Sequence, residues 1–525
     1  MKRLLPLLAA ALLLTALPSA ASASPTQESM FQDDILLVYG APDKMENTLD
    51  QLASFGVDRI RVSVFWDIVA PANDKLQKPQ FDATDPAQYP AANWERYDRL
   101  IRAALNRGIL VNLNITSPVP RWAAATSPRA DLQRTFGPNP AEFENFVAAV
   151  GKRYSGTYQG LPRVDYWSVW NEPNQAGWLT PQWAPDPRNP KRFVEAAPGT
   201  YRALVAGAWR ALAATGHGTD TILVGETAPQ GLQNNKGISR SIDALRFLRR
   251  LYCLDDNLNL LKGTSAEVRS CPQGNPAQFV ADNPALFRAT GYAHHPYDLL
   301  SPPTQRPKPR DWVTLGNLGD LSRELRRIYQ RYGQRTQSSR GVPLYLTEYG
   351  YQTRPDPYAP SFSLQAAYLN QAEHISARNR NVRTLSQFLL VDDAPVPGVS
   401  TQTNPQLAWR TFQSGLTLLN GKRKPSYRAY VTPLVVKNPR VSRATPVRLF
   451  GMLRAAAATT RPVVSIQWRS KNGKRWTSRK RVRVSGPRHY FDTSVRVPGT
   501  GFVRLRWTNG SRALASRAAA VTVTR

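Results

Sequence analysis

The chain has 525 residues, of which 42% are hydrophobic and 10% aromatic, and its formal net charge is +32. This length exceeds one ordinary domain and the composition supplies ample core, so we expect one large domain and a smaller one. Beyond the first residues no stretch approaches the length of a membrane span, which excludes a polytopic membrane protein and predicts no transmembrane segment.

Residues 1–23 have the pattern of an export signal peptide. Lys2 and Arg3 form a charged start, Leu4–Leu17 an apolar run, and Ala21–Ala23 a small-residue cleavage site. The apolar run is short for a membrane span, although an uncleaved anchor is the alternative. We therefore expect a soluble, secreted protein that works outside the cell.

Strand-like and helix-like segments alternate between Asp33 and Asp393. The expected strands are Ile35–Tyr39, Arg59–Trp66, Ile109–Ile115, Tyr166–Trp170, Thr221–Glu226, Gly291–Tyr297, Pro343–Glu348 and Arg383–Val391. Eight apolar strands, most of them followed by a helical pattern, predict an α/β fold, a parallel (β/α)8 TIM barrel over residues 24–430. An open doubly wound sheet is the alternative, but it would need a Gly-rich phosphate turn after an early strand, and the sequence has none.

The end of the chain differs in pattern and in charge. We expect a linker at residues 431–446 and a small all-β C-terminal sandwich domain at residues 447–525, where short alternating runs are separated by Gly, Asn and Pro. From Val441 to Arg525 there are 19 Lys and Arg against one acid, Asp492, a net charge of +18. Such a field favours a polyanionic partner: a cell-wall polymer, an acidic polysaccharide or a membrane surface, but no nucleic acid for an exported protein. A purely solubilising role is the alternative.

The chain has two cysteines, Cys253 and Cys271, and they flank a segment rich in Gly, Ser and Asn. In an oxidising compartment this predicts a disulfide that staples the segment. A metal site is not expected, because two thiols without a nearby histidine are a poor ligand set.

Two strands each end on a glutamate. Tyr166–Trp170 runs into Asn171, Glu172 and a proline, and a second apolar strand ends at Glu348. Burial destabilises a carboxylate anion unless a neighbour stabilises it, so acids at such positions need a reason. Two glutamates at the carboxyl ends of barrel strands indicate the paired carboxylates that cleave a glycosidic bond. Structural, salt-bridged acids are the alternative reading.

Further polar and aromatic residues are expected at the same end of the barrel. They are Arg61, Trp66, Asn114, Trp122, Asn171, Glu226, His294, His295 and Tyr297. Aromatic rings cover the apolar face of a pyranose and polar groups bond its hydroxyls, so the set predicts a sugar site. For Trp66 and Trp122 core packing is the alternative, for Glu226 a supporting role behind the site, and for His294 an outward-facing position.

The segments Trp170–Pro173 and Thr347–Gly350 together resemble the clan of retaining glycoside hydrolases that includes families five and thirty-nine. The resemblance covers roughly residues 33–430. It implies that Glu172 is the acid/base and Glu348 the nucleophile, and that no metal or organic cofactor is needed. His295-Pro-Tyr297 and Arg61 match further motifs of the clan.

Two positions depart from the pattern of family five. Asn114 stands where that family often has a histidine, and Gln387–Leu390 where it has a tryptophan. Both positions touch sugar in the family, so the resemblance does not carry a substrate over to this chain.

The sequence thus predicts a secreted retaining glycoside hydrolase that cleaves O-glycosidic bonds of an oligo- or polysaccharide through a glycosyl-enzyme. Asn171 is expected to bond the sugar 2-hydroxyl, while Arg61 and Tyr297 hold Glu348 in place. One alternative is a transglycosylase on the same scaffold, which passes the sugar to an acceptor hydroxyl. Another is a non-catalytic protein that binds cell wall or polysaccharide.

Overall fold

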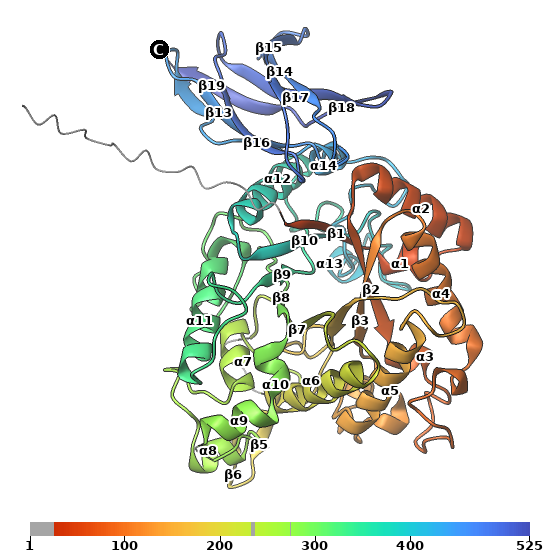
Figure 1. Cartoon of the computed structure of the whole chain (residues 1–525). Helices are drawn as coiled ribbons and strands as arrows, with labels where there is room; N and C mark the ends of the chain where they lie inside the picture. Colours follow the sequence, from red (N-terminus) through yellow and green to blue (C-terminus); the bar gives the residue numbers. More distant parts are fainter. Residues whose placement is uncertain (1–25, 233–236, 274, 525) are drawn as a thin grey trace, which may run out of the picture.

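The computed structural model describes residues 26–232, 237–273 and 275–524. Eight parallel strands form a closed barrel in the order β1-β10-β9-β8-β7-β4-β3-β2, which confirms the predicted TIM barrel (Figure 1). The strands are β1 (Glu28–Gln32), β2 (Arg59–Phe65), β3 (Leu110–Thr116), β4 (Tyr166–Val169), β7 (Thr221–Thr227), β8 (Gly291–His294), β9 (Leu344–Leu346) and β10 (Val382–Phe388). The expected export signal at residues 1–23 lies outside the described residues.

Helices surround the barrel on its outside (Figure 1). The main ones are α2 (Pro42–Phe55), α4 (Ala91–Leu105), α5 (Pro140–Arg153), α6 (Ala197–Ala214), α7 (Ala244–Leu251), α11 (Leu318–Arg331), α12 (Phe362–Arg378) and α14 (Pro425–Val431). Shorter ones are α1 (Asp34–Leu37), α3 (Trp66–Val69), α8 (Gly263–Glu267), α9 (Pro276–Asp282), α10 (Pro284–Arg288) and α13 (Pro405–Ala408). In α2 the residues Met45, Leu49, Leu52 and Phe55 recur every three or four positions and form the buried stripe. No helix within the described ranges combines the length and apolarity that crossing a membrane requires.

The first barrel strand is not the one that the sequence predicts. The prediction of a strand at Ile35–Tyr39 is wrong, because the chain turns into α1 one residue after β1. Asp33 caps that helix, its carboxylate accepting a hydrogen bond from the backbone of Leu36 at 3.1 Å. Ile35 is 56% exposed, whereas the strand residue Phe31 is wholly buried. The apolar run that the sequence predicts as a strand therefore forms part of a short helix at the barrel mouth and does not belong to the barrel wall.

The C-terminal part forms mostly antiparallel sheets, as the sequence predicts. One sheet has the order β11-β13-β16 and the other β12-β19-β17-β14-β15, with β18 paired to β17. The strands are β11 (Leu434–Val436), β12 (Arg440–Ser442), β13 (Val447–Met452), β14 (Val463–Ser470), β15 (Thr477–Arg483), β16 (Tyr490–Val495), β17 (Gly501–Asn509), β18 (Arg512–Ala515) and β19 (Ala519–Thr524). Buried residues of both sheets, such as Leu449 and Leu505, share one core. The segment 431–446, expected as a linker, contains β11 and β12.

Buried polar contacts join the two domains beside α12 and β1. Glu373 of α12 accepts hydrogen bonds from Arg454 at 2.5 Å and from the Tyr490 hydroxyl at 2.7 Å. Arg488 also pairs with Asp58 at 2.6 Å. These contacts fix the C-terminal domain against the barrel.

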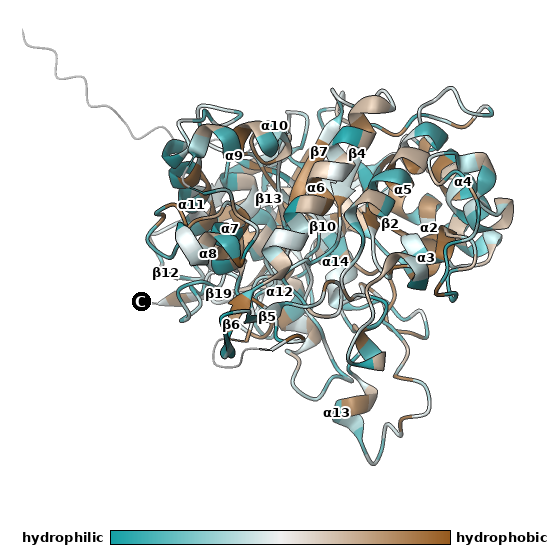
Figure 2. Cartoon of the chain, turned by 90° about the horizontal axis from the view of Figure 1, so that it is seen from below, coloured by the Kyte–Doolittle hydropathy of each residue, from teal (hydrophilic) through white to brown (hydrophobic). Residues whose placement is uncertain are grey.

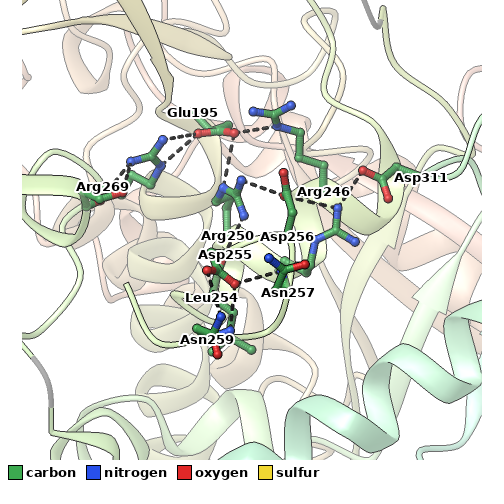
Figure 3. A network of polar contacts seen from close by, with 12 residues as sticks. Glu195, Arg246, Arg250, Leu254, Asp255, Asp256, Asn257, Asn259, Arg269 and Asp311 are labelled. Atoms are coloured by element: carbon green, nitrogen blue, oxygen red, sulfur yellow. Dashed lines mark hydrogen bonds and ion pairs between the residues drawn. The ribbon is translucent and has the colours of Figure 1, made fainter. Parts of the chain in front are cut away.

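A second polar network ties together two insertions of the barrel (Figure 3). The carboxylate of Glu195 lies at the end of the hairpin β5 (Trp183–Asp186) and β6 (Asn189–Glu195) and is wholly buried. Arg246, Arg250 and Arg269 contact it at 2.6, 3.2 and 2.7 Å. Burial alone would raise the pKa of Glu195, but the three guanidinium groups lower it to about 2.

The predicted disulfide lies in the same region and is confirmed. Cys253 and Cys271 are bonded, with their Cα atoms 5.7 Å apart. The bond closes the segment that follows α7, so Arg250 and Arg269 reach Glu195 from its two ends.

We predict that Glu195→Gln destabilises the fold by about 3 kcal/mol, because removing one partner of a buried ion pair leaves the other charges uncompensated. The pKa of Glu195 is lowered from 4.5 to about 2, so its contribution is complete above pH 4.5 and is lost as the pH falls through 2. Urea unfolding at neutral and acidic pH measures the difference, which should shrink in acid.

The control for this prediction is Glu267→Gln. Glu267 pairs with Arg188 at 2.6 Å, but its side chain is 61% exposed. Its removal should leave the unfolding free energy nearly unchanged. Equal losses for the two variants would contradict a special role of Glu195.

Candidate active site

A cavity of about 650 Å³ opens at the carboxyl ends of the barrel strands. Gln32, Asn171, Glu172, Tyr297 and Glu348 are among its lining residues and come from four different strands or the turns after them. The long connection after β10, which carries α13 and stands out from the barrel in Figure 2, forms another part of its wall. The predicted site residues therefore meet at the end of the barrel where we expect them.

The backbone is strained where two of the acids leave their strands. Glu172 has a φ of +37° and Glu226 a φ of +46°, and both lie in the left-handed region that costs energy for a residue with a side chain. The backbone N–H of Glu172 donates to the carbonyl of Glu226 at 2.9 Å, which ties the two turns together. The strain turns both carboxylates toward the barrel axis.

Glu172 and Glu348 lie opposite each other in the cavity. One carboxylate oxygen of each lies within 4.8 Å of the other. Their side chains are only 18% and 11% exposed, so both acids are largely withdrawn from water but open to a ligand.

The guanidinium of Arg61 lies beneath this pair and is wholly buried. Its Nη1 donates to Gln32 at 2.6 Å and to Glu348 at 2.7 Å. Its Nη2 donates to Asn171 at 2.6 Å and to Glu226 at 3.0 Å. One cation from β2 therefore fixes polar groups that belong to β1, β4, β7 and the end of β9.

His295 is the second cation of the site. Its Nδ1 lies 2.9 Å from Glu172 and 3.5 Å from Glu348, and its Nε2 lies 2.8 Å from Glu226. Burial alone would lower the pKa of His295, but the three carboxylates raise it to about 9. The imidazole is therefore protonated at neutral pH and donates from both ring nitrogens.

Glu226 is the anion that holds the two cations in place. Burial alone would raise its pKa, but Arg61 and His295 lower it to about 2. The hydroxyl of Thr347 adds a hydrogen bond to it at 2.7 Å. Glu226 does not line the cavity, so it supports the residues that do.

Glu348 receives two hydrogen bonds that favour its ionised form. Arg61 donates to one carboxylate oxygen and the Tyr297 hydroxyl to the other, at 3.1 Å. Burial raises the pKa of Glu348, while the positive charges of His295 and Arg61 oppose that rise.

Some predicted residues neither line the cavity nor contact the two glutamates in it, among them Asn114, Trp66 and Trp122. Asn114 is buried and donates to the carbonyl of Trp170 at 2.9 Å, so it supports the turn before Glu172. The predicted sugar contact of Trp66 is wrong, because its ring is wholly buried and stacks on Phe146 behind the barrel wall. Trp122 packs edge-on against Trp66 and does not line the cavity either.

Strand alternation explains the error at Trp66 and identifies residues that the sequence analysis missed. Arg61 points to the barrel axis, so Phe65, four positions on, must point the same way and Trp66 the opposite way. Phe65 does line the cavity and stacks on Trp178 with the ring centres 6.3 Å apart. Gln32 also points to the barrel axis, from the end of β1. It could not be identified from the sequence, because the first strand was predicted at Ile35–Tyr39.

Glu172, His295 and Glu348 are also close enough to share a metal ion, since one donor atom of each lies within 4.8 Å of the others. The chemistry of this set opposes such a use. A protonated His295 has no lone pair to give, and Arg61 already neutralises Glu348.

Comparison with known proteins gives one family. The sequence model described as cellulase (glycosyl hydrolase family 5) matches residues 20–380. No curated protein sequence matches the chain.

Several solved structures are similar in fold. A monomeric beta-xylosidase from Caulobacter crescentus CB15 is 16% identical with a TM-score of 0.50, covering 91% of this chain and 95% of that chain. A family 39 glycoside hydrolase from the gut symbiont Bacteroides cellulosilyticus WH2 is 14% identical with a TM-score of 0.43, covering 90% and 79%. GH5_18 from Streptomyces cattleya, in complex with GlcNAc, is 15% identical with a TM-score of 0.43, covering 78% and 80%.

The charge on His295 leads to a test by stability. Its pKa is raised from 6.5 to about 9, so its contribution to stability is complete below pH 6.5 and is lost as the pH rises through 9. Through this group the wild type should lose about 3 kcal/mol of unfolding free energy over that range, and His295→Asn should not. Urea unfolding of both proteins at several pH values measures this.

His294→Asn is the matched control. Burial lowers the pKa of His294 to about 3, so this ring is neutral throughout the range and its loss should leave the pH dependence of the wild type intact. Parallel curves for wild type and His295→Asn would show that His295 carries no proton in the folded protein.

Proposed function

The chain belongs to glycosyl hydrolase family 5, and on that premise we propose that this glycosidase is exported and works by double displacement with retention of configuration. Glu172 is the acid/base and Glu348 the nucleophile. The observation that carries the proposal is the approach of their carboxylate oxygens to within 4.8 Å. Retaining enzymes hold the two carboxyl groups about 5–5.5 Å apart, whereas inverting enzymes leave about 6.5–9.5 Å for a water molecule.

In the first step Glu172 protonates the departing glycosidic oxygen while Glu348 attacks the anomeric carbon. Glu172 and Glu348 face the sugar, and Arg61 and His295 lie beneath them with Glu226 as their further anionic partner. The hydrogen bonds from Arg61 and Tyr297 keep Glu348 ionised and aimed at the anomeric carbon.

In the second step Glu172, now ionised, takes a proton from water, which attacks the glycosyl-enzyme and releases the sugar. Asn171 supports both steps. Its amide oxygen is engaged by Arg61, so its amide nitrogen is turned to donate to the sugar 2-hydroxyl, a bond that strengthens as the transition state develops.

The rim of the cavity supports a substrate with an apolar leaving group. Ile35, Leu299, Leu300, Tyr358 and Phe412 line the cavity, yet they are between 46% and 63% exposed. They come from the connections after β1, β8, β9 and β10, so the apolar rim surrounds the mouth on several sides. Exposed apolar groups gathered at one place mark a binding surface.

Two features of the chain support the proposal that it is exported. The first 23 residues have the charged start, apolar run and small-residue site of a signal peptide. The disulfide between Cys253 and Cys271 suits an oxidising compartment.

The roles of the glutamates can be separated with an aryl glycoside that has a good leaving group. Glu172→Ala should still form the glycosyl-enzyme and release a burst of phenol, but steady turnover should fall about 10²–10⁴-fold because the base is missing. Azide should restore turnover by attacking the intermediate. Glu348→Ala should give no burst, since no covalent intermediate can form. If the two variants exchange these behaviours, the roles are reversed.

The apolar rim predicts a preference for long alkyl glycosides. An octyl glycoside should show a KM at least about tenfold below that of the methyl glycoside, because several CH₂ groups lose contact with water. The double variant Leu300→Ser, Tyr358→Ser should lose most of that difference in KM, while its KM for the methyl glycoside should stay unchanged. Leu76→Ser, at a 65% exposed residue outside the cavity, is the control. An unchanged ratio in the double variant would rule out this use of the rim.

A further inference from the structure

A second cavity, of about 1110 Å³, lies between the barrel and the C-terminal domain. Residues at and before α14 form its barrel side, and β17, β18 and the residues after them form the other side. In Figure 1, α14 lies next to these strands. The cavity shares no lining residue with the catalytic cavity.

The walls of this cavity are strongly basic, and no acid is among the described residues that line it. Six arginines line it: Arg423, Arg428, Arg504, Arg506, Arg512 and Arg517. Within the part of the chain that the structure describes, none of the six forms an ion pair with a carboxylate. Lys424 also lines the cavity, but its ammonium is buried and paired with Asp392 at 2.6 Å.

This cluster differs from the other arginines of the C-terminal domain near the barrel. Arg454 and Arg488 each contact a carboxylate of the barrel. The six cavity arginines gather their charges around an open space instead. Like charges repel one another, so this cluster costs free energy that a bound anion would offset.

The sheet places these charges by simple alternation. Val503 and Leu505 of β17 are buried in the domain core, so Arg504 and Arg506 face outward into the cavity. Burial, together with the neighbouring Arg506, Arg428 and Arg469, lowers the pKa of Arg504. Arg428 belongs to α14, so the two domains bring their charges to the same place.

An aromatic ring completes the cavity wall. Trp476 lines it, and the guanidinium groups of Arg504 and Arg469 lie 4.2 and 5.3 Å from the centre of the indole. The indole therefore stacks on guanidinium and holds Arg504 in place by a cation–π contact, while guanidinium forks bind carboxylate or sulfate groups with two hydrogen bonds.

We propose that this cavity binds an acidic polysaccharide, with arginines of both domains holding its carboxylate or sulfate groups and Trp476 holding Arg504 in position. The volume far exceeds that of a single inorganic ion, which suits a polymer segment. The cavity is a hollow between two domains, with Arg504 and Arg517 partly buried in it, and a polymer chain can enter such a hollow whereas a flat bilayer cannot. The proposal is independent of the catalytic roles of Glu172 and Glu348.

The experiment measures binding of the full-length protein to polygalacturonate, dextran sulfate and neutral dextran at low and high salt. The first two should bind and dextran should not, and binding should weaken as salt reduces the screening length below about 8 Å. Tighter binding of polygalacturonate would identify carboxylate as the preferred group, and tighter binding of dextran sulfate would identify sulfate. Absence of binding to both acidic polymers at low salt would overturn the proposal.

Variants locate the site. Arg504→Ala with Arg506→Ala should weaken binding by at least about tenfold, as the loss of two charge-assisted contacts implies. Arg428→Ala, on the barrel side, and Trp476→Ala should each weaken it as well. Arg479→Ala with Arg483→Ala removes the same charge from β15, outside the cavity, and should have less than a twofold effect.

Two results would contradict the site. Equal loss in the Arg504/Arg506 and Arg479/Arg483 variants would mean that the overall positive field binds the polymer and the cavity does not. Tighter binding to duplex DNA or to anionic vesicles than to either polysaccharide would identify another ligand class. Thermal melting and turnover of the aryl glycoside, unchanged in all variants, establish that each is folded.

Discussion

The buried guanidinium of Arg61 is the interaction on which the site depends. A cation without access to water needs close partners for its charge, and four oxygen acceptors at the ends of β1, β4, β7 and β9 accept hydrogen bonds from the two Nη atoms of Arg61. Because those acceptors belong to different strands, the register of the barrel decides whether these four contacts form. The same register sets the separation of Glu172 and Glu348, so the stability of the barrel and the geometry of the site have one cause.

Charge balance within the site follows from this arrangement. Glu226 is wholly buried and strained in its backbone, yet it touches no part of the cavity. It contacts Arg61 and His295 and so holds them beneath Glu172 and Glu348. In the proposed mechanism the network therefore places two positive charges where negative charge changes during the reaction, and no solvent rearrangement is needed to provide them.

Much of this could be predicted from the sequence, and the failures have physical reasons. Apolar strands that end on Glu172 and Glu348 were sufficient to predict the barrel and the carboxylate pair. The first strand was misplaced because Leu36, Leu37 and Val38 are apolar and buried although they lie in and after the short helix α1, and a short apolar run cannot by itself distinguish a buried helix from a core strand. Trp66 was assigned to the site by residue type, although the alternation from Arg61 points to Phe65. The basic charge of the C-terminal domain is visible in composition, but only the folded arrangement, in which α14 and β17 line one cavity, gathers it around a common space.

The contact of Glu373 with Arg454 and Tyr490 has a consequence for how such a chain can evolve. Glu373 is 3% exposed, and although Gln27 of the barrel domain donates to it at 3.2 Å, its cation and its hydroxyl partner come from the C-terminal domain. A barrel that lost this domain would leave Glu373 without a positive charge beside it, and a barrel that exchanged it would need a new partner with a cation in register. Separating the two domains therefore breaks a buried ion pair, which makes the barrel of this chain poorly suited to use as a portable module.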